Sequence, residues 1–246
     1  MSASQYLQAV RDITHHIEET QLDSIGRAAD IVIESITHGG VVYCAEIGHG
    51  NQYDFLNRAG GLAAVQHFSY SYNVNSPTPA CLANRPREEM IEVDLENARH
   101  AVRTSNLRKG DVLIVSSVSG KGRNPIELAL AARQIGVQVI GLTSVEYTSQ
   151  VISSHTSGKR LIEVVDIAID IGAPYGDAVI EMAGFDQKVM PISGVSMICI
   201  GWMLWGTVME RMAASGNPPT VYTSVNREGG QAFYETSRKQ YEDRGY

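Results

Sequence analysis

The feature that most constrains the fold is a stretch between residues 111 and 144, where apolar runs flank a polar glycine loop and a helical segment. The run Val112–Val115 is Val-Leu-Ile-Val, which is typical of a parallel strand buried on both faces. Ile126–Ile135 is apolar and alanine-rich with helical spacing, Gly136 ends that helix, and Val137–Leu142 reads as the next strand. This strand–helix–strand order predicts an α/β fold with a parallel sheet.

The loop that joins the first strand to the helix, Ser116–Arg123, is small and polar. Asn124 is expected to cap the helix, with Pro125 at the first helical position. Free backbone N–H groups and the positive dipole end make a helix N-terminus an anion site. An ordinary turn would not require Ser-Val-Ser-Gly followed by two cations. The residues expected to hold the anion are Ser117, Ser119, Gly120, Lys121 and Asn124.

A second unit of this kind occurs earlier in the chain. Val41–Ile47 is an apolar strand, Gly48-His-Gly-Asn51 is a glycine loop, and a helix is expected from there to Ala64. Two glycine loops after apolar strands are better evidence for a ligand site than one. Ligands of such sheets bind outside the carboxyl ends of the strands. Both loops are therefore expected at one crevice, together with Thr143, Ser144 and the loop 171–177.

The rest of the chain continues the alternation of helices and strands. The expected elements are a helical region over Ser4–Thr37 with a break near Leu22-Asp23, a short strand within Gln66–Asn73, a helix over Arg87–Asn106, a strand over Val164–Ile169, a helix over Pro191–Ala214, a strand over Thr220–Ser224 and a helix over Gly230–Asp243. This order predicts a doubly wound parallel sheet of about five strands, flanked by helices. We expect one domain over 1–246, whose helical region 1–38 packs on the sheet or on a partner subunit.

Composition excludes several classes of function. The net charge of −7 gives no basic surface for nucleic acid. The three cysteines, Cys44, Cys81 and Cys199, are odd in number and far apart, which indicates free thiols in a reducing cytoplasm. No Cys/His cluster has zinc spacing, and the glycine loops lack the dinucleotide and P-loop patterns, so no metal or cofactor is expected.

One uncharged segment, Val189–Met209, is long enough to cross a membrane. Its proline, glycine, serine and threonine residues dilute the hydrophobicity, so a buried helix or an interface helix is the favoured interpretation, and no membrane partner is expected. This segment and the N-terminal helical region both carry apolar surface that a partner subunit would bury, which favours a homodimer or a higher homo-oligomer.

Several motifs resemble those of the SIS (sugar isomerase) superfamily. Ser117–Gly120, Glu127 in the following helix and Val139–Ser144 in the next strand match its signature. Further segments that resemble its phosphosugar isomerase branch are Arg58–Leu62, Ser154–Leu161, Pro174–Ala178 and Gly229-Gly230 with Tyr241. Their order fits nearly the whole chain. The resemblance implies a flavodoxin-like fold and binding of a phosphorylated sugar, and it implies a reaction less strongly, because the fold also hosts lyases and regulators.

An aldose–ketose isomerase needs a phosphate anchor, a base near the first two sugar carbons and a group that helps to open the ring. We expect the serine loop to be the anchor, closed by Thr143 and Ser144 from the next strand end. Glu46, at the end of an apolar strand, is the first candidate base, and its plain alternative is a carboxylate that accepts loop N–H groups. The other candidates for chemistry are Asp54 as base and His49 or His155 for ring opening, and Gly48 and Asn51 are expected to contact substrate. The resemblance implies that residues of a neighbouring subunit can complete such a site, and His155 is a candidate for that role.

The chain departs from the resemblance after its first strand. The family pattern there is Gly-x-Gly-His-Ser-His, whereas this chain has Gly48-His-Gly-Asn51. The half of the site that faces the sugar is therefore expected to differ while the phosphate half is kept. An isomerase acting on a sugar phosphate is the favoured function, with a lyase or deglycase of phosphosugars and a non-catalytic phosphosugar sensor as alternatives.

Overall fold

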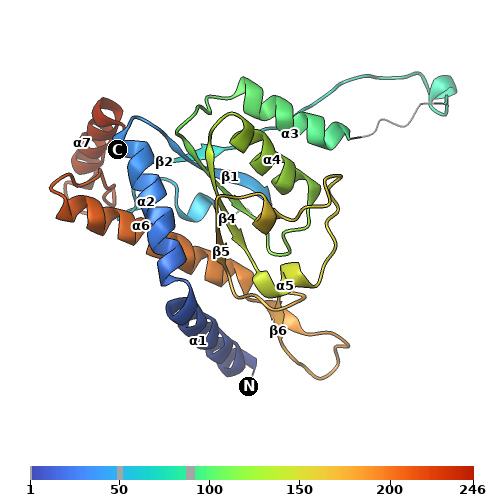
Figure 1. The fold of residues 1–246 in the computed structure, drawn as a ribbon, viewed down its shortest axis with the longest axis horizontal. Helices are drawn as coiled ribbons and strands as arrows, with labels where there is room; N and C mark the ends of the chain where they lie inside the picture. The colour runs from blue at the N-terminus through green and yellow to red at the C-terminus, as the bar shows by residue number, and fades with distance from the viewer. Residues whose placement is uncertain (1, 49–51, 87–91) are drawn as a thin grey trace.

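The computed structural model describes residues 2–48, 52–86 and 92–246, and it is built around a twisted parallel sheet (Figure 1). The five strands are β1 (Val42–Gly48), β2 (Val65–Phe68), β3 (Val112–Ser116), β4 (Gln138–Thr143) and β5 (Ile167–Asp170). They lie in the order β2-β1-β3-β4-β5, and all of their pairings are parallel. This is the flavodoxin-like order of a doubly wound sheet, which confirms the predicted fold class.

Helices cover both faces of the sheet (Figure 1). One face carries α1 (Ser2–Thr20), α2 (Leu22–Thr37) and α6 (Ser193–Ala214), and the other carries α3 (Val93–Thr104) and α4 (Arg123–Gln134). The side chains of β3 alternate between the two layers, as the pleat of a strand requires. Val112 and Ile114 pack toward the first group of helices, and Leu113 and Val115 pack toward α4. Burial on both faces explains why the strand has no polar residue before Ser116.

Several short elements complete the fold. They are α5 (Val145–Ser149), the hairpin strands β6 (Ala178–Ile180) and β7 (Val189–Pro191), the C-terminal helix α7 (Gly230–Arg244), and the 3-10 turns η1 (Gln52–Asp54), η2 (Ala80–Leu82) and η3 (Leu161–Glu163). The predicted break in the N-terminal helical region is confirmed at Gln21. The helix predicted from Arg87 begins at Val93, and residues 87–91 lie outside the described part of the chain.

The helix predicted to run to Ala64 is wrong, because η1 is followed by turns. Phe55 is drawn into the core, where its ring centroid lies 5.8 Å from that of Trp202 and 6.1 Å from that of Trp205. Gly60 has a φ of 78°, and its N–H donates to the carbonyl of Tyr222 over 2.7 Å. These long-range contacts override the local preference for a helix.

The strand predicted over Thr220–Ser224 is also wrong. The segment forms an isolated antiparallel bridge between Val221 and Leu62, and only a few further backbone hydrogen bonds accompany it. The chain between η1 and β2 is therefore tied to a segment about 160 residues later, a link that local sequence patterns do not contain.

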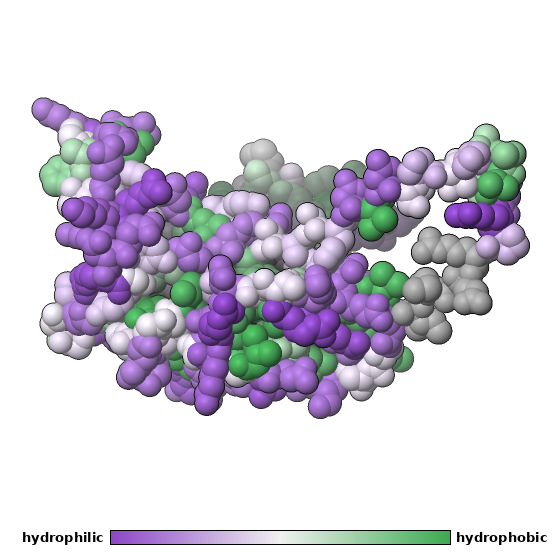
Figure 2. Space-filling view, turned by 90° about the horizontal axis from the view of Figure 1, so that it is seen from above, coloured by the Kyte–Doolittle hydropathy of each residue, from purple (hydrophilic) through white to green (hydrophobic). Residues whose placement is uncertain are grey.

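Every residue over 71–86 is exposed, and the part of this arm that carries η2 stands away from the body of the molecule (Figures 1 and 2), whereas Tyr72 still packs on His100 of α3. This arm begins directly after Tyr70 and carries η2. Among the helices in the described ranges, including α6, none combines the length and the apolar character needed to cross a membrane.

Candidate active site

The two glycine loops leave the sheet at neighbouring positions. Gly48, at the end of β1, pairs with Ser116 at the end of β3, and Ser116 pairs in turn with Leu142 on β4. The carboxyl ends of these parallel strands therefore bring residues near 46–48, 117–124 and 143–144 to the same edge of the sheet, as the sequence predicted.

The serine loop presents free hydrogen-bond donors at the start of α4. The N–H of Ser117 is used by the carbonyl of Leu142, and that of Gly120 by the carbonyl of Ser117. Within the described residues no acceptor is found for the side chains of Ser117 and Ser119, nor for the N–H groups of Ser119, Lys121, Gly122 and Arg123. Such a group of unpaired donors at a helix N-terminus is suited to an anion. We call these donors the anion cradle.

The shape of the cradle depends on Gly120, which has a φ of 63°. A Cβ atom at Gly120 would lie 2.8 Å from Oγ1 of Thr148 and 2.9 Å from Oγ1 of Thr143. The Thr148 hydroxyl also donates to the carbonyl of Ser119 over 3.0 Å. Only glycine fits this left-handed position so close to two threonines.

Thr143 and Ser144 are fully buried behind the cradle and do not line the crevice. Oγ1 of Thr143 lies 3.2 Å from that of Thr148. Oγ of Ser144 accepts from the N–H of Tyr147 over 3.0 Å, which caps α5, and it donates to the carbonyl of Ala173. The prediction that these two hydroxyls close the phosphate site is corrected by their geometry, because they support the loop from behind.

The two cations near the cradle differ in their availability. Arg123 is bound to the carboxylate of Asp94 through two hydrogen bonds of 2.9 and 3.2 Å, and the guanidinium lowers the pKa of that carboxyl. Lys121 is exposed, and its ammonium group has no ion-pair partner in the described part of the chain. Lys121 is therefore the cation that remains free to attract an anion.

The start of α4 differs from the prediction in a way that matters for the site. Gly122 occupies the N-cap position, Arg123 is the first helical residue, and the Asn124 side chain does not cap the helix. Pro125 is third in the helix, where a missing N–H still costs no intrahelical bond. The Asn124 carboxamide is consequently free for another role.

Glu46 forms a polar cluster with two residues that sequence analysis did not identify. Its carboxylate lies 3.5 Å from Nε2 of His67 and accepts a hydrogen bond of 3.4 Å from the Tyr53 hydroxyl. The Tyr53 ring packs on the His67 ring with centroids 5.3 Å apart. The Glu46 side chain is 49% exposed, so it is open to a ligand to a greater extent than its apolar strand suggested.

His67 reaches Glu46 because of the strand register. Cys44 on β1 pairs with His67 on β2, and Glu46 lies two residues after Cys44, where the pairing of β1 with β3 shifts its register. The signal that could have found His67 is the parallel pairing of β1 with β2, which single-sequence patterns do not provide.

A cavity of about 280 Å³ lies beside the Glu46 cluster. It is lined by Glu46, Phe68, Ser69, Tyr70 and Asn124. Burial, together with the nearby Tyr72 and Asp94, raises the pKa of Tyr70, so its phenol stays protonated at neutral pH and can act as a donor. Oδ1 of Asn124 is buried and has no hydrogen-bond partner in the ranges 2–48, 52–86 and 92–246. The cavity is thus shared by the Glu46 carboxylate and by Asn124, which directly follows the cradle residues in the chain.

The other predicted site residues contribute less to this geometry. His49 and Asn51 lie outside the described residues, and Gly48 is placed only through its backbone pairing with Ser116. Asp54 is half-buried in η1 and makes no hydrogen bond or ion pair with any described residue.

His155 is buried behind the cradle and does not face the crevice. Its Nε2 lies 2.7 Å from Oε2 of Glu127, whose other oxygen accepts a 2.5 Å hydrogen bond from Nε of Arg99. Burial raises the pKa of Glu127, but the bonds from Arg99 and His155 outweigh it and hold that pKa below its ordinary value. The loop that carries His155 is fastened to the cradle, because the N–H of Leu161 donates to the carbonyl of Gly120 over 2.8 Å. The imidazole therefore supports the site of its own chain.

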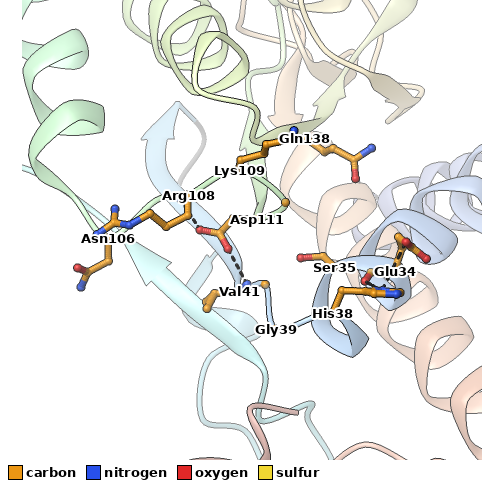
Figure 3. Close-up of a pocket in the computed structure, with 12 residues that line it drawn as sticks. Glu34, Ser35, His38, Gly39, Val41, Asn106, Arg108, Lys109, Asp111 and Gln138 are labelled. Carbon is orange, nitrogen blue, oxygen red and sulfur yellow. Dashed lines mark hydrogen bonds and ion pairs between the residues drawn. The ribbon is translucent and has the colours of Figure 1, made fainter.

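A second cavity of about 280 Å³ lies at the opposite edge of the sheet (Figure 3). Asp111 lies in its wall, where its carboxylate accepts from the N–H groups of Val41 and Arg108 over 2.9 and 2.7 Å. This edge holds the amino ends of the strands, whereas ligands of doubly wound sheets bind at the carboxyl ends. The cavity beside Glu46 is therefore the candidate active site.

In the ranges that the structure describes, no group of three or more His, Cys, Asp or Glu residues is placed to hold a metal ion. Among its described residues, the candidate site offers hydrogen-bond donors, one free cation and one open carboxylate, a set of groups suited to a polar anionic molecule.

The fold and site together define an α/β protein with an anion cradle after its third strand and a carboxylate near the end of its first. The model of the SIS domain family matches residues 5–144, and the chain belongs to this family. The resemblance inferred from the Ser-x-Ser-Gly motif is thereby confirmed.

Relatives of similar length align over almost the whole chain. A UPF0309 protein of Listeria monocytogenes is 32% identical over 242 residues, which is 97% of this chain and 95% of the relative. A UPF0309 protein of Streptomyces coelicolor is 31% identical over 245 residues, 98% of this chain and 96% of the relative.

Two solved structures share the fold. The phosphoheptose isomerase of Neisseria gonorrhoeae aligns with a TM-score of 0.52 and 16% identity over 84% of this chain and 96% of its own. The phosphoheptose isomerase of Francisella tularensis aligns with a TM-score of 0.53 and 14% identity over the same shares. At this level of identity the likeness concerns the fold alone.

Proposed function

We propose that this protein is an enzyme that binds a sugar phosphate and interconverts its aldose and ketose forms. The observation that carries the proposal is the cavity that the open carboxylate of Glu46 lines together with Asn124, the residue that directly follows the anion cradle in the chain. Membership of the SIS domain family supports a phosphorylated sugar as the ligand.

The phosphate group would be held by the unpaired N–H groups and hydroxyls of the cradle, with Lys121 adding charge. Donors that are already in position lose little entropy on binding, and the dipole of α4 favours a dianion. Anchoring the phosphate fixes the far end of the sugar, so its carbonyl end is directed along the cavity toward Glu46.

The Glu46 carboxylate would act as the base. It takes the proton from the carbon next to the carbonyl, the electron pair of that C–H bond forms the enediolate, and the same carboxyl returns the proton to the neighbouring carbon. The hydroxyl proton moves between the two oxygens, so atoms and electrons balance. Tyr53 and His67 contact the carboxylate and orient it, and His67 is better placed than the buried His155 to assist ring opening.

A thermal-shift screen followed by product analysis tests this function. Tetrose to heptose phosphates and amino-sugar phosphates are compared, because the stabilisation of the folded state grows with the ratio of the ligand concentration to its Kd. Ligands found in this way are incubated with the protein and analysed by mass spectrometry and NMR. An isomer of unchanged mass is expected. A product of lower mass would indicate elimination or release of a group, and binding without any product would indicate a sensor, so either result contradicts the proposed reaction.

Two variants link the activity to the site. Ser119→Ala removes a cradle donor and should weaken binding, whereas Glu46→Gln keeps the shape of the base but removes its function and should lower turnover by about 100-fold or more. Unchanged turnover in Glu46→Gln would reject Glu46 as the base.

A further inference from the structure

The carboxamide oxygen of Asn124 is an acceptor that receives no hydrogen bond from the described part of the chain. Asn124 is in the first turn of α4 and lines the cavity that also contains Glu46. Its Oδ1 atom is buried and has no hydrogen-bond partner among the residues that the structure describes, and the helix does not use it as a cap. A buried acceptor without a partner costs free energy in the ligand-free protein, so its retention in a cavity points to a ligand that supplies the partner.

The chemistry of this atom restricts the ligand. Oδ1 of an amide only accepts hydrogen bonds, and the oxygens of a phosphate dianion also only accept them. The phosphate therefore suits the neighbouring N–H groups of the cradle but not Oδ1 of Asn124. A sugar hydroxyl both donates and accepts, so it can donate to Oδ1 and complete the site.

We propose that Asn124 is a specificity-determining residue that accepts a hydrogen bond from a sugar hydroxyl close to the phosphorylated end of the substrate. Its location supports this assignment, because Asn124 directly follows the cradle residues in the chain and lies on the cavity wall that leads toward Glu46. The inference rests on the proposed function and narrows its substrate class to sugar phosphates with a free hydroxyl at that position. Deoxy analogues and simple phosphate esters would leave Oδ1 unpaired.

Calorimetric binding of two kinds of probe tests the inference. Inorganic phosphate and the sugar phosphates that stabilise the protein are titrated into the wild type, Asn124→Ala and Ser119→Ala. Asn124→Ala should leave the Kd of inorganic phosphate within about twofold and weaken the sugar phosphate by about tenfold, the factor expected for one hydrogen bond. Ser119→Ala is the matched control and should weaken both probes by the same factor.

A deoxy series provides a second measurement that needs no variant. For the wild type, one deoxy analogue should bind about tenfold more weakly than its parent sugar phosphate. The same analogue should have the same Kd for Asn124→Ala as for the wild type, because the hydrogen bond is already absent. Asn124→Ser preserves a short polar residue in the first turn of α4, and it serves if the alanine variant does not fold. Thermal unfolding of each variant separates loss of the site from loss of the fold.

The outcomes distinguish this inference from the function on which it rests. If the wild type binds sugar phosphates, and Asn124→Ala weakens neither probe or weakens both equally, Asn124 does not read the sugar and only this inference fails. If the wild type binds inorganic phosphate but no sugar phosphate, the proposed function fails and the inference fails with it.

Discussion

Nε2 of His155 lies 2.7 Å from Oε2 of Glu127, and both side chains are almost completely buried behind the anion cradle. The contact joins the helix that begins at the cradle to the loop that carries the Ser-His-Thr-Ser-Gly sequence. Arg99 on α3 holds the second oxygen of Glu127, so three parts of the chain meet at one carboxylate. Glu127 and His155 thus set the position of the cradle without facing the ligand.

Removing Glu127 should destabilise the protein strongly. Glu127→Ala leaves Arg99 and His155 without their buried partner, which costs about 3–5 kcal/mol in the free energy of unfolding. Urea denaturation followed by circular dichroism measures this value. Arg133→Gln is the control on the same helix, because its ion pair with Asp166 is partly exposed and should contribute less than about 1 kcal/mol. Equal losses of unfolding free energy in the two variants would show that the buried Glu127 network contributes no more to stability than a partly exposed ion pair.

The same carboxylate predicts how stability depends on pH. The pKa of Glu127 in the folded protein is lower than its ordinary value of 4.5, so its contribution to stability is complete above pH 4.5 and is lost as the pH falls through the lowered folded pKa. The free energy of unfolding should therefore fall more steeply in wild type than in Glu127→Gln between about pH 4.5 and pH 3. Parallel curves in this range would contradict the direction of the shift.

Two neighbouring glycines should respond differently to alanine. Gly120 has a φ of 63°, and its Cβ would meet two threonine hydroxyls at under 3.0 Å, so Gly120→Ala should cost about 1–3 kcal/mol of stability and weaken phosphate binding. Gly122 has a φ of −66°, and its Cβ would meet Pro125 at an ordinary 3.5 Å, so Gly122→Ala should be tolerated. Denaturation and phosphate titration of both variants check the contrast. Phosphate binding by Gly120→Ala at wild-type affinity would show that the cradle does not depend on this backbone geometry.

The cysteines should differ in reactivity. Cys44 is buried on β1, and burial raises the pKa of its thiol to about 12, so the reactive thiolate is almost absent at neutral pH. Cys81, on the exposed arm, should react with a thiol reagent in the native protein, and Cys44 should react only after unfolding. Mass spectrometry of the labelled peptides, with a denatured sample as control, measures both. Rapid labelling of native Cys44 would contradict the buried position of β1.

The helices and strands were predictable from sequence where the burial of an element leaves its mark in that element's own residues. The buried strand Val112–Ser116 and the helix that ends before Gly136 were visible because burial on both faces imposes an unbroken apolar run. The segment after Asp54 was not predictable, because its conformation depends on Phe55 packing against Trp202 and Trp205 almost 150 residues later. The strand predicted over residues 220–224 was wrong for the same reason, since the isolated bridge in this segment pairs Val221 with the distant Leu62.

The candidate site divides in a similar way. The anion cradle was predictable, because a Ser-x-Ser-Gly loop between a strand and a helix creates its donors locally. His67 was missed because it reaches Glu46 across two paired strands, and the burial of His155 was missed because its partner Glu127 is on a different element. Asn124 was predicted as a cap, but the N-cap is Gly122, two residues earlier, and the helix begins at Arg123, which leaves the Asn124 carboxamide in the cavity wall.

The most direct test of the proposed isomerase is proton exchange in deuterated water. A sugar phosphate that stabilises the protein is incubated with the wild type and with Glu46→Gln, and deuterium at the carbon next to the carbonyl is followed by NMR. We expect deuterium incorporation and isomer formation with the wild type. With Glu46→Gln, both rates should be lower by about 100-fold or more while the Kd of the sugar phosphate is preserved. Binding without any incorporation, or equal rates for the two proteins, would contradict the proposed mechanism.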